Sequence, residues 1–140
     1  MSLLDVQEMR RRINDVMVAR LATVGRDGRP HLVPITFAAD DDGTLYFAID
    51  QKPKKSVDLQ RLRNIEANPA VCVLVDHYDD DWTTLWWVRI DGSARIVGEG
   101  PDFERAIAML TERYAQYRSV RPLGPVAVIR VERMTGWSAS

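Results

Sequence analysis

The chain has 140 residues and a formal net charge of -1 at neutral pH, with 46% hydrophobic and 28% charged residues. This balance predicts one folded domain over residues 1–140 and excludes both a disordered chain and the broad basic face of a dedicated nucleic-acid binder. The sequence has no run of about 18 apolar residues and no signal-peptide core at its N-terminus, so we expect a cytoplasmic protein without a membrane partner.

Helix-like and strand-like patterns follow one another in the first half of the chain. Apolar residues at three- and four-residue steps predict an amphipathic helix over 3–17. Strand-like runs over 18–24 and 31–39 flank an Asp-Gly turn and predict a hairpin, and a third run over 44–49 should pair back on the second as a meander. Pro34 cannot donate a ladder hydrogen bond, so it predicts an edge, a bulge or a place where a ligand lies.

The second half contains two further helical patterns among strands. The predicted elements are a helix over 57–67, a strand over 70–75, one strand over 82–98 or two strands broken at Asp91–Gly92, a helix over 101–117, and a last strand from Val126. Antiparallel strands joined by tight turns, with a few helices outside the sheet, favour an α+β fold. We expect a six- to seven-stranded antiparallel barrel with flanking helices, because closure also removes exposed strand edges.

Five cations lie within twelve residues, between the third predicted strand and the following helix: Lys52, Lys54, Lys55, Arg61 and Arg63. Phosphates and carboxylates need several fixed donors close together, and the start of a helix adds unpaired backbone N–H groups. The cluster therefore predicts an anion-binding site. A solvated charged face is the alternative interpretation of the same residues.

Other familiar kinds of site are not indicated. The single cysteine, Cys72, lies in an apolar run and is expected to act as a small buried hydrophobe. His31 and His77 are far apart and have no ligand spacing around them, so no metal site is expected. The acidic runs 40–42 and 79–81 are typical of turns, and no nucleophile elbow is present.

Four segments around the cation cluster resemble a known family in their order and spacing. The segments 61–71, 20–24, 27–31 and 33–37 are similar to the basic helix and the opening hairpin of the pyridoxamine 5'-phosphate oxidase-like split β-barrels. The short chain, Trp82 after an acidic turn and the ending over 131–137 resemble the actinobacterial branch that uses the deazaflavin coenzyme F-420.

This resemblance implies a homodimer with cofactor sites at the subunit interface. By analogy Lys54, Lys55 and Arg61 would meet the cofactor phosphate, with Arg63 and Lys52 as helpers. The remaining implied cofactor contacts are Val33, Pro34, Ile35 and Thr36 beside the tricyclic ring, Ala48, Ile49 and Asp50 beside the sugar-like chain, and Trp82 as the tryptophan best placed to touch a ligand.

The function implied is that of an oxidoreductase that transfers a hydride from reduced F-420 to a small planar or conjugated substrate. The cofactor carries this chemistry, so no catalytic side chain is required, although Tyr78 and Arg89 would be proton donors or substrate anchors if they face the pocket. Trp86 and Trp87 must face opposite sides of a strand, one toward the barrel and one toward a dimer partner. The alternatives are an FMN-dependent enzyme and a non-catalytic protein that binds a flavin, a deazaflavin or a tetrapyrrole.

Overall fold

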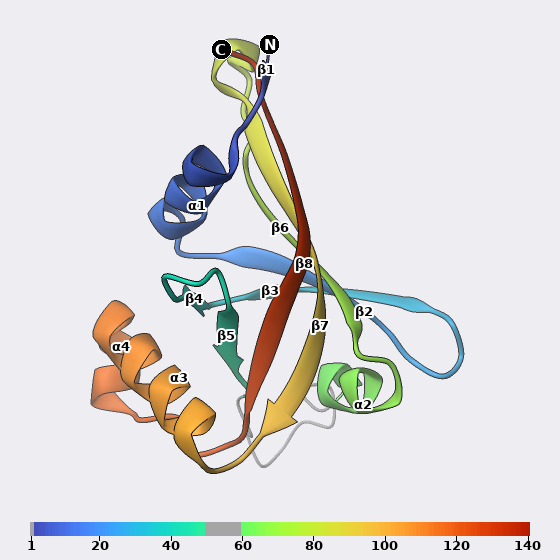
Figure 1. The fold of residues 1–140 in the computed structure, drawn as a ribbon, viewed down its shortest axis with the longest axis vertical. Helices are drawn as coiled ribbons and strands as arrows, with labels where there is room; N and C mark the ends of the chain where they lie inside the picture. The colour runs from blue at the N-terminus through green and yellow to red at the C-terminus, as the bar shows by residue number, and fades with distance from the viewer. Residues whose placement is uncertain (1, 50–59) are drawn as a thin grey trace.

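A computed structural model describes residues 2–49 and 60–140, which form helices and strands in the order shown in Figure 1. The helices are α1 (Val6–Asp15), α2 (Gln60–Ala67), α3 (Pro101–Arg113) and α4 (Ala115–Ser119). The strands are β1 (Ser2–Leu3), β2 (Ala19–Val24), β3 (Pro30–Ile35), β4 (Ala38–Ala39), β5 (Leu45–Ala48), β6 (Ala70–His77), β7 (Trp86–Val97) and β8 (Val126–Ser138).

The strands of the described residues form one antiparallel sheet in the order β3-β2-β6-β7-β8-β5-β4, and β1 is added beside the end of β8. The two outermost strands of this order, β3 and β4, are separated in the chain only by residues 36–37. Two residues can bridge about 11 Å at most, so the two ends of the sheet must come together and the sheet must curl. The predicted antiparallel barrel with flanking helices is confirmed. The helix predicted over 3–17 is shorter, because Leu3 pairs with Trp137 in β1 and α1 spans only Val6–Asp15.

The run predicted as one strand over 31–39 forms two strands that belong to opposite ends of the sheet. β3 pairs with β2, whereas β4 pairs with β5 through Ala38–Tyr46 and Ala39–Leu45. The meander prediction was therefore wrong for most of this run, because the main neighbour of β5 is β8. The prediction that Pro34 lies on an edge is confirmed, since β3 pairs with a single strand among the described residues.

The prediction for β7 as one long strand is confirmed from Trp86 onward, and Asp91–Gly92 marks an irregularity within it. The pairing with β8 shifts register at this point, because Asp91 pairs with Arg133 and Gly92 with Val131, so β8 contains a bulge at Glu132 and β7 continues without a break. Trp82–Thr84 instead form a 3-10 turn, in which the Asp81 side chain accepts hydrogen bonds from the backbone and hydroxyl of Thr83.

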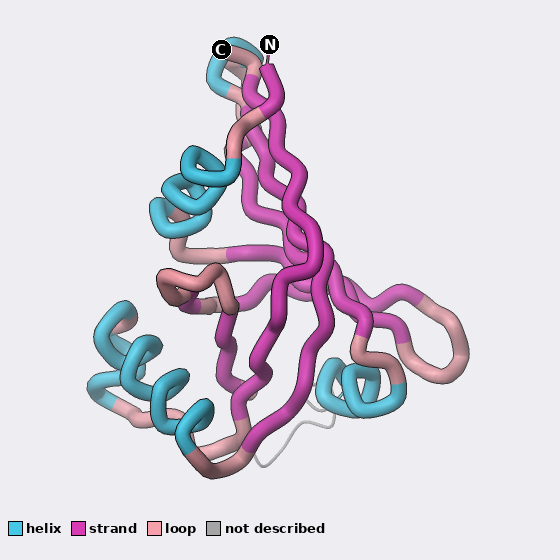
Figure 2. Tube along the Cα trace, viewed as in Figure 1, coloured by secondary structure: helices cyan, strands magenta, loops and turns pink. Residues whose placement is uncertain are grey.

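Two apolar clusters lie on the two faces of the curled sheet. The inner face holds the larger cluster, which includes Leu21, Phe37, Phe47, Val73 and Ile90, and it is covered by Met9 and Ile13 of α1 and Ile65 of α2. The second cluster lies between the outer face of β5 and β8 and the helix α3. Figure 2 shows the helices grouped around the sheet in this way.

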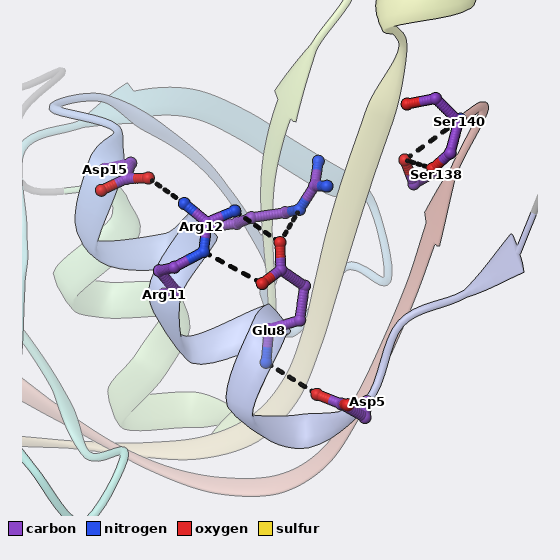
Figure 3. A network of polar contacts seen from close by, with 7 residues as sticks. All are labelled: Asp5, Glu8, Arg11, Arg12, Asp15, Ser138 and Ser140. Carbon is purple, nitrogen blue, oxygen red and sulfur yellow. Dashed lines mark hydrogen bonds and ion pairs between the residues drawn. The ribbon is translucent and has the colours of Figure 1, made fainter.

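Charged side chains bind one another along the exposed side of α1 (Figure 3). Asp5 caps the helix by accepting a hydrogen bond from the Glu8 amide at 2.8 Å. Hydrogen bonds from Arg11 and then Arg12 lower the pKa of Glu8 to about 2. The guanidinium of Arg12 also lies over the Trp86 ring at 5.1 Å, so this network connects α1 to β7.

The predicted helix over 101–117 is wrong at one residue, because Tyr114 has an extended conformation between α3 and α4. This break lets the Tyr114 ring become buried and brings its hydroxyl to the backbone of residues 17 and 37. The hydroxyl accepts from the Phe37 amide at 3.0 Å and lies 2.8 Å from the Met17 carbonyl oxygen and 2.9 Å from that of Phe37. The sequence pattern favours a continuous helix, but the hydrogen bonds of Tyr114 to distant backbone groups accompany a break in it.

Candidate functional site

The two described cations of the cluster, Arg61 and Arg63, start α2 and point in different directions. Their positions differ by about 200° around the helix axis. The guanidinium of Arg61 lies 6.0 Å from the centre of the Phe47 ring, over the inner face of the barrel. Arg63 is exposed and donates a hydrogen bond to Gln60 at 3.2 Å. The other predicted members, Lys52, Lys54, Lys55 and Asp50, lie outside the described residues.

Arg61 has a buried donor without a partner in the part of the chain that the structure describes. Its Nε is buried and makes no hydrogen bond within the described part of the chain. Buried donors are nearly always paired, so an unpaired one calls for an explanation such as a missing ligand. Among the described residues, the other buried side-chain atom without a partner is Nδ1 of His31, on β3. From the sequence, the His31 side chain had been weighed only as a metal ligand.

A buried polar contact fixes α2 against the barrel. The side chain of Asn64 donates a hydrogen bond to the Thr23 hydroxyl of β2 at 3.0 Å and accepts one from Gln60 at 2.8 Å. Gly25 lies so close that a Cβ there would be 2.4 Å from the Asn64 amide oxygen. This contact holds Arg61, one turn earlier in α2, in a fixed position. No sequence pattern indicated the contact between Asn64 and Thr23.

The predicted ring-binding segment lies along the edge of the sheet. Val33 is half-buried, Pro34 is exposed and Ile35 is buried. Thr36 follows the end of β3, and its hydroxyl is 2.9 Å from that of Tyr117 in α4. Because β3 has one neighbouring strand within residues 2–49 and 60–140, backbone groups on its other side are not used by the described sheet and could contact a ligand.

Ala48 and Ile49 lie at the end of β5, close to the Phe47 ring that Arg61 approaches. Both side chains are buried, Ala48 under α3 and Ile49 in the inner cluster, and the Ile49 amide donates to the Pro125 carbonyl at 2.9 Å. These two predicted contacts could therefore reach a ligand only through the remaining backbone atoms.

Trp82 is remote from Arg61 within one chain. It is 77% exposed and lies at the tip of a long arm, residues 76–87 of the β6–β7 hairpin, at the top of Figure 1. The segment after α2 pairs with Ser93, seven residues beyond Trp86, so roughly 23 Å of strand separates the two regions. The predicted contacts Trp82 and Arg61 are not brought together in a single subunit.

An aromatic groove lies on the outer face of the arm. It is lined by Leu74, Asp76, Tyr78, Trp87 and Arg89, so the two residues named as possible proton donors or anchors, Tyr78 and Arg89, share one groove with a tryptophan. Arg89 forms an ion pair with Asp91 at 2.9 Å. Trp86 instead packs against the inner cluster, which confirms that the adjacent tryptophans face opposite sides.

The outer face of β6 is more exposed than the sequence predicted. Cys72 and Leu74 are half-buried, whereas Val71, Val73 and Val75 are buried in the inner cluster. Burial raises the pKa of the Cys72 thiol, so it stays protonated at neutral pH.

Residues 2–49 and 60–140 contain neither a membrane-spanning helix nor a group of metal ligands. No helix there is long and apolar enough to cross a membrane. In the same residues, no three or more His, Cys, Asp or Glu side chains are grouped to hold a metal ion.

Several solved structures share this fold over almost the whole chain. The conserved hypothetical protein Rv2991 of Mycobacterium tuberculosis is 26% identical, with a TM-score of 0.74 over 97% of this chain and 86% of that one. A FAD-binding protein of Mesorhizobium loti is 22% identical, with a TM-score of 0.71 over 96% and 95% of the two chains. A heme binding protein of Mycobacterium smegmatis is 19% identical, with a TM-score of 0.73 over 94% and 57%.

No protein of curated function matches the chain significantly. The family model described as pyridoxamine 5'-phosphate oxidase matches residues 6–138. That match includes the edge strand, Arg61 and the arm, and the chain therefore belongs to the pyridoxamine 5'-phosphate oxidase family.

Proposed function

We propose that this protein is a homodimeric oxidoreductase that uses reduced coenzyme F-420 to deliver a hydride to a small planar or conjugated organic substrate. The observation that carries the proposal is the position of Arg61. Its Nε is buried and has no partner within residues 2–49 and 60–140, and its guanidinium lies over Phe47, so a phosphate bound there would supply an acceptor. The family is described as pyridoxamine 5'-phosphate oxidase, whose substrate carries a phosphate, and this description is in keeping with a phosphate site.

The residues around Arg61 fit a cofactor that has a phosphate at one end and a flat ring at the other. The edge of β3 offers backbone groups to the carbonyls and nitrogens of a ring, because the described sheet does not use them. Pro34 has no amide N–H, so β3 cannot form a regular ladder with another strand at this position. A bound deazaflavin supplies the hydride, so the protein has to orient the ring and exclude water. The lysines at 52 and 54 favour F-420 over FMN, because the F-420 tail carries additional carboxylates.

The outer face of the sheet supports a second subunit. Its described part carries exposed or half-buried apolar side chains that run across five paired strands: Leu32, Ala22, Leu74, Trp87 and Trp137. An uncovered apolar face of this kind usually marks an interface. With two copies, the arm of one subunit can bring Trp82, Tyr78 and Arg89 to the cation cluster of the other, which removes the separation found within one chain.

Leu74→Asp is expected to convert the dimer into monomers, because it would bury an unpaired carboxylate in the proposed interface. The measurement is molar mass by light scattering after size-exclusion chromatography. Leu123→Asp is the matched control, since Leu123 is 94% exposed and lies outside the sheet. A wild-type protein that is monomeric at micromolar concentration, or a Leu74→Asp variant that stays dimeric, would contradict the proposed interface.

Titration of the purified protein with F-420 and, separately, with FMN tests the cofactor directly. We expect quenching of F-420 fluorescence with micromolar or tighter affinity and weaker binding of FMN. Tight FMN binding without F-420 binding would replace the deazaflavin by a flavin in the proposal. Bound cofactor must then be reduced and offered quinones and enones, and oxidation of the reduced cofactor by one of them is the expected result.

A non-catalytic binding protein is the second candidate function, and one observation favours it. A structure of the same fold, 19% identical to this chain, is described as a heme binding protein. This candidate predicts a visible Soret band shift on addition of hemin and no turnover of any acceptor by the reduced cofactor.

A further inference from the structure

The connection between β3 and β4 is the point at which the barrel closes, and it lacks partners within the sheet. Among the described residues, Ile35 ends a strand that pairs only with β2, and Ala38 begins a strand that pairs only with β5. Thr36 and Phe37 lie between them, so neither residue has a place in a described strand pair. Their polar groups need partners elsewhere, because Phe37 is fully buried and Thr36 is half-buried.

The break between α3 and α4 supplies these partners. Tyr114 binds the amide and carbonyl of Phe37, as described above, and also the Met17 carbonyl. The guanidinium of Arg113 lies 5.2 Å from the centre of the Phe37 ring and donates a hydrogen bond to the Val16 carbonyl. One turn later the Tyr117 hydroxyl bonds the Thr36 hydroxyl at 2.9 Å.

Tyr114 and Tyr117 have different effects on this connection. Tyr114 is buried and its hydroxyl bonds backbone groups, so Tyr114 stabilises the closure of the barrel. Tyr117 bonds the side chain of Thr36. The hydrogen bond between the two hydroxyls selects one Thr36 rotamer and turns the Thr36 hydroxyl toward α4. The rings of Tyr114 and Tyr117 meet edge to face, with centroids 5.7 Å apart, so the position of Tyr117 is itself fixed.

We propose that Tyr117 is a positioning residue for the cofactor ring, and that it acts by fixing Thr36 at the end of the ring-binding segment. This inference rests on the proposed function, in which Val33, Pro34, Ile35 and Thr36 lie beside the ring. With its hydroxyl bound to Tyr117, Thr36 presents its methyl group and backbone to a neighbouring ligand. Loss of the bond frees the Thr36 rotamer and the ring contact becomes heterogeneous.

Tyr117→Phe tests this inference because it removes only the hydroxyl and keeps the edge-to-face contact. Thr36→Val removes the other half of the bond and keeps the methyl group. FMN and F-420 are the probes, and the measurements are the dissociation constant and the absorption spectrum of the bound probe. We expect each variant to weaken binding by about threefold to tenfold, the range for the loss of one hydrogen bond, and to broaden or shift the spectrum of the bound ring.

The double variant separates one shared interaction from two independent ones. If the two hydroxyls act through their mutual bond, Tyr117→Phe/Thr36→Val should bind the probe no more weakly than either single variant. Thr111→Val is the control, because the Thr111 hydroxyl bonds carbonyls of its own helix and should leave affinity and spectrum unchanged.

Three results would overturn the inference. Wild-type affinity and spectrum in both single variants would show that the bond does not affect the ring, and additive losses in the double variant would show that Tyr117 does not act through Thr36. Failure of the wild-type protein to bind either probe would remove the proposed function and this inference with it. The first two results would leave the proposed function standing.

Discussion

Replacement of Arg61 by alanine should weaken the binding of a phosphate-bearing cofactor by about 30- to 100-fold, which corresponds to about 2–3 kcal/mol for lost charge-assisted hydrogen bonds. The expected effect is large because Arg61 faces the inner side of the barrel and its buried Nε has no partner among the described residues. The fold should persist, since α2 stays anchored by the buried Ile65 and by the contact between Asn64 and Thr23. Fluorescence titration and the thermal midpoint measure the two effects separately.

Arg63→Ala is the matched control for this experiment. It removes the same charge from the same helix turn, but Arg63 is exposed and lines a surface groove with Arg26, Asp27 and Glu66. We expect a loss of affinity of no more than about threefold, as is typical for an exposed charge. Arg61→Lys should recover part of the lost affinity, because it restores the charge without the planar fork. Equal losses for Arg61→Ala and Arg63→Ala would indicate a diffuse electrostatic effect and no defined phosphate site.

Gly92→Ala should lower the free energy of unfolding by about 3 kcal/mol, near the upper end for overpacking of a closed core. A Cβ at Gly92 would lie 2.6 Å from the Arg130 carbonyl oxygen and 2.9 Å from a methyl carbon of Ile129. The first of these atoms belongs to the backbone of β8, at the bulge, and cannot move without breaking the β7–β8 pairing. Urea unfolding followed by circular dichroism measures the loss.

Gly98→Ala is the control for Gly92→Ala. Gly98 follows β7 and is exposed, and a Cβ at this position would meet no atom of the described residues within 4 Å. The change should alter the free energy of unfolding by less than about 0.5 kcal/mol, as for most surface substitutions. A Gly92→Ala variant as stable as Gly98→Ala would mean that the bulge can rearrange to accept a side chain.

Local patterns were enough to predict most of the elements and the class of fold. The amphipathic period predicted α1, the Asp-Gly turn predicted the β2–β3 hairpin, and Pro34 correctly indicated an edge. The patterns failed where distant groups decide the local structure. The helix over 101–117 breaks at Tyr114 because its hydroxyl bonds Phe37, 77 positions away, and no window of sequence contains both residues.

The candidate site was predictable in part. Helical phase could have separated Arg61 from Arg63, because Arg61 lies about 40° from the buried Ile65 around the helix and Arg63 about 200°. The pairing of Asn64 with Thr23 could not be inferred, since it depends on which strand lies beside α2. The same limit applies to Trp82, whose distance from Arg61 follows from the length and direction of β7. The predicted roles of Lys52, Lys54, Lys55 and Asp50 remain predictions.

The order of strands also has a consequence for how the protein folds as it is synthesised. The main neighbour of β5 is β8, with Leu45 paired to Ile129, and β2 pairs with β6, although three strands and α2 lie between them in the chain. Such pairings between distant parts of the chain carry a high entropic cost of loop closure and slow the folding of a domain. Until the last strand has been made, β5 and β7 each lack a neighbour and expose edges that can associate with other chains. Pairing of β8 with β5 and β7 is therefore the step that covers these exposed edges during synthesis.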